Sequence, residues 1–160
     1  MVLFANLQFQ HNLARTQSIR NPAGGPAIPG VALSGGNLNL KPEEAETGAV
    51  RRLADKLMKM AQEQARAMAS HDKLDHNVIR DFGERLKVAG YKSTVAAENI
   101  GAGYHTLAEA FSGWRDSPPH RANMLLSGAT RMGIAAVYSP KSKYKVFWAL
   151  ILAAPEEGRG

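Results

Sequence analysis

From Lys41 onward, apolar side chains recur at steps of three and four residues, a spacing that places them on one face of a helix. The positions on this face are Val50, Leu53, Leu57, Met60 or Ala61, Gln64 or Ala65, and Met68. Charged residues fall largely on the opposite face. Pro42 suits a first helical turn, where the missing N–H has no helical partner to lose. The pattern predicts one long amphipathic helix that ends near Ser70.

A shorter helix is expected next, because Val78, Phe82, Leu86 and Ala89 share one face and Gly90 suits its C-terminal stop. The chain from 91 to 97 is predicted to be extended. Glu98 would then end this strand, just before a glycine-rich bend over residues 101–103.

A third helix is predicted to begin at Thr106, because Thr106 and Glu109 have the spacing of a capping box. Pro118 and Pro119 would end it, and a short helical turn is expected over residues 121–125. Two further strands, 132–138 and 145–153, are joined by a polar connection typical of a hairpin. Helices combined with an antiparallel sheet predict an α+β layered fold.

Residues 1–41 differ from the rest of the chain: they contain no Asp or Glu and are rich in closely spaced Pro and Gly. They are predicted to form a divergent or flexible N-terminal extension, followed by one domain over 42–155 and a tail over 156–160. Val2, Leu3 and Phe4 do not make a convincing signal peptide, because the apolar stretch is too short and no basic region precedes it.

Composition narrows the classes of function. The 160 residues contain no cysteine, which excludes disulfides, thiolate metal sites and a cysteine nucleophile. No apolar run reaches the length of a transmembrane segment, about 20 residues. The net charge of +6 comes from dispersed basic residues, so nucleic acid is not an expected partner, whereas an anionic surface remains one.

The candidate chemistry rests on histidine and carboxylate. His76, Glu98 and His120 are expected at the edges of helices and strands, where side chains can meet in one cavity with Ser117, Asn99 and Asn123. Two imidazoles and one carboxylate can hold zinc and leave a position for water, with Glu98 as general base. Alternatively, each histidine is a cap or a satisfied polar group, and Glu98 forms a structural bridge with Arg121. Spacing alone leaves both interpretations open.

These residues resemble the CAP superfamily of cysteine-rich secretory, antigen 5 and pathogenesis-related proteins, and most of all its cysteine-free bacterial SCP-like branch. The resemblance covers about residues 45–155. It rests on Asp75-His76, on Ala97-Glu98-Asn99-Ile100, on Gly113-Trp114, and on the run from Ser117 to Leu125. It implies a three-layer α-β-α sandwich with a central antiparallel sheet.

The resemblance also implies a cavity with two histidines and two glutamates, of which His76, His120 and Glu98 match three. Ser117 stands at the position of the second glutamate, and a hydroxyl is a poorer zinc ligand than a carboxylate. The family association with lipids, sterols and extracellular interactions favours a non-enzymatic module that binds a small molecule or lipid. The alternative is a zinc-dependent peptide hydrolase. An extracellular or periplasmic location is implied; the oligomeric state is left open.

Overall fold

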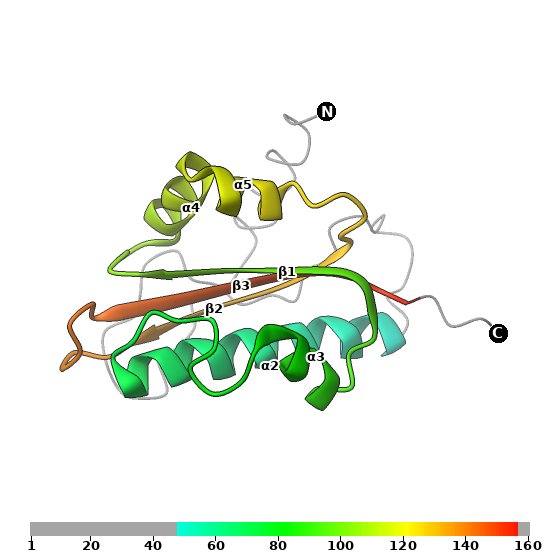
Figure 1. Cartoon of the computed structure of the whole chain (residues 1–160), viewed down its shortest axis with the longest axis horizontal. Coiled ribbons are helices and arrows are strands. Elements are labelled where there is room, and N and C mark those ends of the chain that lie inside the picture. Colours follow the sequence, from blue (N-terminus) through cyan, green and yellow to red (C-terminus); the bar gives the residue numbers. More distant parts are fainter. Residues whose placement is uncertain (1–47, 157–160) are drawn as a thin grey trace.

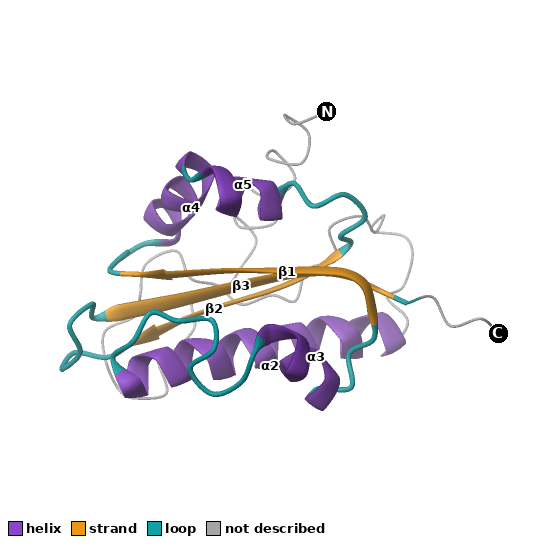
Figure 2. Cartoon of the chain, in the orientation of Figure 1, coloured by secondary structure: helices purple, strands orange, loops and turns teal. Residues whose placement is uncertain are grey.

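The computed structural model describes residues 48–156, which form three layers (Figures 1 and 2). In chain order the elements are α2 (Gly48–His71), α3 (Phe82–Val88), β1 (Ser93–Ala102), α4 (Leu107–Asp116), α5 (Pro118–Met124), β2 (Arg131–Tyr138) and β3 (Val146–Pro155). Helices α2 and α3 cover one face of the sheet, and α4 and α5 lie on the other. The expected α-β-α sandwich with a central antiparallel sheet is confirmed.

The sheet has the order β1-β3-β2, with both neighbouring pairs antiparallel. Strand β3 is therefore central, and eight consecutive residues from Val146 to Ala153 are buried. This explains why the most apolar run of the chain shows no polar alternation: each of its faces is covered by helices. Strand β1, which carries Glu98, is an edge strand.

The long helix packs closely against β2 and β3. Leu57, Met60 and Met68 are buried against Phe147 and Ile151, so the methionines of this helix are core residues, as expected. Gly133 on β2 lies directly beneath the helix, and a Cβ built there would overlap the backbone of Leu57. The close approach of α2 to the sheet therefore requires glycine at this position.

The other face of the sheet holds a second apolar cluster around two tryptophans. Trp114 of α4 and Trp148 of β3 are both buried in it. Each indole N–H donates to a backbone carbonyl: Trp114 to Ile100 at 3.0 Å and Trp148 to Tyr104 at 2.7 Å. The Trp114 bond ties α4 to the C-terminal half of β1, and the Trp148 bond ties β3 to the loop that follows β1.

Most predicted elements are present, and four features differ from the prediction. Helix α3 begins at Phe82, so Val78, expected on its inward face, lies in the loop before it. Glu98 does not end β1, because the strand continues to Ala102. The bend begins only at Gly103, whose φ is 83°. Pro118 and Pro119 form the first turn of α5 instead of only ending α4. Two prolines can start a helix because the first N–H groups of a helix have no internal acceptor. The start of the first predicted helix and the 1–41 extension lie outside the described residues.

Candidate functional site

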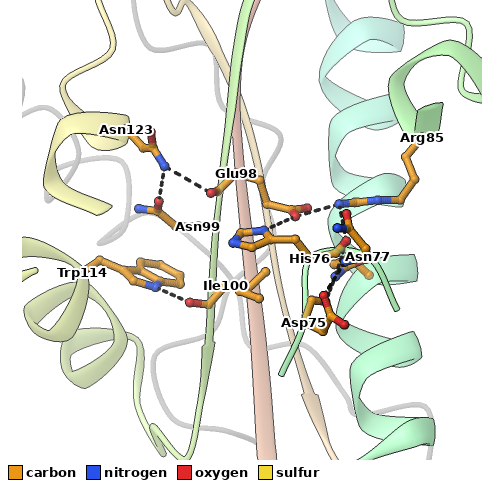
Figure 3. A network of polar contacts seen from close by, with 10 residues as sticks. Asp75, His76, Asn77, Arg85, Glu98, Asn99, Ile100, Trp114 and Asn123 are labelled. Atoms are coloured by element: carbon orange, nitrogen blue, oxygen red, sulfur yellow. Dashed lines mark hydrogen bonds and ion pairs between the residues drawn. The ribbon is translucent and has the colours of Figure 1, made fainter. Parts of the chain in front are cut away.

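Glu98 is buried at the edge strand and joins three segments of the chain (Figure 3). Its Oε1 accepts from Arg85 Nη2 of α3 at 2.7 Å and lies 2.8 Å from Nδ1 of His76. The side chain of Glu98 is only 2% exposed and that of Arg85 only 11%. Because an ionised carboxylate only accepts hydrogen bonds, Nδ1 of His76 carries the proton in this contact.

Arg85 and Gln64 also hold the loop that carries His76. Arg85 Nη2 also lies 3.3 Å from the backbone oxygen of His76, and Gln64 Nε2 of α2 donates to the backbone oxygen of Asp75 at 2.8 Å. The Asp75 side chain accepts from the N–H of Asn77 at 2.9 Å, which closes a tight turn. We call Gln64, His76, Arg85 and Glu98 the polar cluster.

On the opposite side of β1, amides fix the start of α5. Asn99 Nδ2 donates to the backbone oxygen of His120 at 3.0 Å. Asn123 Nδ2 donates to Asn99 Oδ1 at 2.9 Å and lies 3.2 Å from the backbone oxygen of Glu98. Figure 3 shows Glu98 and Asn99 pointing to opposite sides of the strand, as successive residues of a strand must. Both asparagines therefore tie strand β1 to helix α5.

His120 is paired with the residue at the position of the second family glutamate. Its Nδ1 lies 2.7 Å from Ser117 Oγ, so Ser117 does not cap α5 with its side chain. Burial, and then the nearby charge of His76, lower the pKa of His120 below its usual value. His120 is therefore held in its neutral form around pH 7.

Residues 46–152 match the model of the cysteine-rich secretory protein family, CAP. The chain belongs to the CAP family. No curated protein matches it.

Two solved structures share the CAP fold. An extracellular protein with an SCP domain from Bacillus anthracis is 23% identical over 62% of this chain, with a TM-score of 0.53. The chain spans about a third of that protein, 32% of its length. An outer surface protein from Borrelia burgdorferi is 16% identical, with a TM-score of 0.58. The match covers 64% of this chain and 75% of that protein. At these identities the likeness concerns the fold.

The structure links the predicted site residues of this CAP domain: Asn99 and Asn123 donate to the backbone oxygens of His120 and Glu98, and so connect two side-chain pairs. His76 binds Glu98, and His120 binds Ser117. The alternative bridge from Glu98 to Arg121 is wrong, because Arg85 occupies that role. Sequence reasoning did not identify Arg85, and it placed Gln64 or Ala65 on the inward face of α2 without a role in the site. A charged residue on a short amphipathic helix resembles a solvated one, and only the approach of α3 to β1 reveals the pair.

The arrangement does not fit a three-ligand zinc centre. Across residues 48–156, no three His, Asp or Glu side chains converge on a point where they could hold a metal ion. The one oxygen of Glu98 that faces His76 is already shared with a guanidinium. Its other oxygen, Oε2, is buried without a hydrogen-bond partner in this part of the chain.

A groove of about 400 Å³ lies between α2 and α3 of this CAP domain, beside the polar cluster. Gln64 and Arg85 belong to both. Ile79 and Val88, which are 62% and 68% exposed, form its apolar wall. The remaining lining residues are Lys56, Lys59, Met60, Glu63, Arg80 and Ala89.

Among residues 48–156, no helix has the length and hydrophobicity that a bilayer span requires.

Proposed function

We propose that this CAP domain is a non-enzymatic module that binds a small apolar or amphipathic molecule in the groove between α2 and α3. The observation that carries the proposal is the double engagement of Glu98 by Arg85 and His76 in a buried setting. In this proposal Glu98 does not act as an acid or a base. It instead holds the residues that support the groove.

The support acts through the loop between α2 and α3. Gln64 and Arg85 hold the backbone of residues 75 and 76, and the same loop supplies Ile79 and Arg80 to the groove. The volume of about 400 Å³ falls within the usual range for ligand pockets, roughly 300–1,000 Å³. Two large exposed apolar side chains on one wall are the kind of surface that a ligand covers.

We place the module outside the cytoplasm, as in the extracellular and outer surface proteins that share its fold. The absence of cysteine is compatible with this location, because a bacterial exported domain need not contain disulfides. Its basic net charge of +6 would add attraction to anionic surfaces there.

The binding proposal is tested with a neutral naphthylamine probe whose fluorescence rises in an apolar environment. We expect a saturable increase with the full chain. The increase should be lost in Ile79→Glu, which puts a charge on the apolar wall. It should persist in Leu125→Glu, a matched change at an exposed leucine just after α5 that does not line the groove. It should also persist in His120→Ala.

A zinc-dependent hydrolase makes the opposite prediction. It requires metal-dependent cleavage of a labelled protein substrate that disappears in Glu98→Gln and in His120→Ala, with the naphthylamine signal unaffected by groove changes. Saturable probe binding that is lost in His120→Ala and kept in Ile79→Glu would contradict the groove as the binding site.

A further inference from the structure

The connection between β2 and β3, residues 139–145, forms one end of the described chain, beside the C-terminal end of α2 (Figure 1). It carries Lys141, Lys143 and Lys145, and all of these lysines are exposed. The connection contains no acidic residue. We call residues 139–145 the basic tip.

The positive charge of the basic tip is not neutralised within residues 48–156. None of its lysines forms an ion pair in that part of the chain. Lys145 Nζ donates to the backbone oxygen of Pro140 at 2.8 Å, and Lys143 Nζ lies 5.1 Å from the centroid of the Tyr144 ring. Both of these partners are uncharged, so the ammonium groups remain able to attract an anion.

Hydrogen bonds hold the basic tip in one conformation. Ser142 is buried; its Oγ donates to the backbone oxygen of Ser139 at 2.8 Å and accepts from the N–H of Lys145 at 3.1 Å. Asp72, just after α2, accepts from the N–H of Lys143 with both carboxylate oxygens at 2.9 Å.

Two residues of this network have a backbone conformation that is rare outside glycine. The φ of Lys145 is 66° and that of Asp72 is 48°. Such a conformation costs free energy and persists only where the surrounding contacts enforce it. The lysines are therefore presented from a fixed loop, and little backbone entropy would be lost when an anion binds.

We infer that the basic tip binds a linear phosphate polymer that carries no bases. Lysine ammonium groups are point charges that suit phosphate, whereas a planar carboxylate is matched best by the fork of arginine, which the tip lacks. Bases would need an exposed aromatic ring on which to stack. Tyr144, the one aromatic residue of the tip, is half-buried and packs edge-on against Phe147 with ring centroids 5.8 Å apart. The tip shares no residue with the groove, so this partner does not depend on the proposed function.

The test is a fluorescence-anisotropy titration of labelled inorganic polyphosphate with the full chain at several salt concentrations. We expect saturable binding whose log affinity falls linearly with log salt concentration, because neutralised phosphates release counterions. Lys141→Gln combined with Lys143→Gln should weaken binding about tenfold. It should also flatten the salt slope by about 1.4, at about 0.7 for each charge on a single strand. Lys145 is kept because its N–H and its ammonium group hold the loop.

Matched variants distinguish the basic tip from net charge. Lys87→Gln combined with Lys92→Gln removes two exposed lysines on and after α3, which lies well away from the tip in Figure 1. This pair should change the affinity by less than about twofold, because salt screens charges beyond about 10 Å.

The carboxylate that contacts the tip provides a second comparison. Asp72→Asn should tighten binding about two- to fivefold, because it removes a negative charge beside the lysines, and asparagine tolerates a positive φ. Asp55→Asn makes the same change about 25 Å earlier along α2, at 1.5 Å per residue, and should have no comparable effect.

Equal losses in the two lysine pairs, or equal gains in Asp72→Asn and Asp55→Asn, would overturn the inference, because net charge alone would then explain binding. Polyglutamate bound as tightly as polyphosphate would overturn the assignment to phosphate. Tighter binding of single-stranded DNA would show that bases contribute, and would overturn it as well. The absence of saturable binding at low salt would contradict the inference. Binding to phosphatidylglycerol vesicles without binding to polyphosphate would also contradict it, in favour of a membrane contact.

Discussion

Replacing Glu98 by glutamine tests whether this carboxylate has a structural or a catalytic role. Glutamine keeps the shape and one acceptor oxygen, but it leaves the Arg85 guanidinium, only 11% exposed, without a counter-charge. Removing one partner of a buried ion pair costs about 3–5 kcal/mol. We expect about 3 kcal/mol here, at the lower end, because the amide oxygen still accepts from Arg85. For a domain of this size the melting temperature should fall by roughly 10 °C.

The assay is urea unfolding followed by tryptophan fluorescence, which reports on Trp114 and Trp148 in one buried cluster. Glu63→Gln is the control: it removes an exposed carboxylate of α2 and should change the free energy of unfolding by less than about 0.5 kcal/mol. Adding Arg85→Gln to Glu98→Gln should restore part of the loss, because the unpaired charge disappears. Unchanged or raised stability in Glu98→Gln would refute the reasoning, since a carboxylate kept for catalysis is often held at the expense of stability.

Three further predictions concern packing, capping and protonation. Gly133→Ala should destabilise the fold by about 2–4 kcal/mol because the new methyl group overlaps the backbone of Leu57, whereas Gly83→Ala on α3 should be close to neutral by the same urea assay. Thr106→Ala removes the capping box of α4 and should cost about 1 kcal/mol in thermal unfolding. The imidazole of His120 should titrate below its usual pKa of 6.5 in an NMR pH series. Because the unfolded chain takes up that proton first, stability should fall as the pH drops through about 6.5, and His120→Gln should reduce this fall.

Local patterns in the sequence were sufficient for most of the framework. Three- and four-residue periodicity located α2, and its predicted end near Ser70 agrees with the observed end at His71. The capping box of Thr106 and Glu109 is present with both of its hydrogen bonds. These features depend on neighbours within one turn, so the sequence carries the whole signal.

What the sequence did not predict depends on contacts between distant segments. Gly101 reads as part of a bend, yet it continues β1, because it pairs with Trp148 of β3. The Tyr104 ring and the Trp114 indole occupy the space that a Cβ would need at this position. The pairing of Arg85 with Glu98 spans 13 positions and requires α3 to meet the edge strand. The groove has the same origin, since α2, the loop and α3 each supply part of its lining.

The groove is located most directly by a two-dimensional amide NMR titration of the full chain with the neutral naphthylamine probe. Binding in the groove should give saturable shifts confined to residues 56–64 of α2 and to residues 79–89 of the loop and α3. Shifts centred on Ser117, His120 and Asn123, with the α2 and α3 amides unmoved, would contradict it. They would place the ligand in the histidine cavity instead.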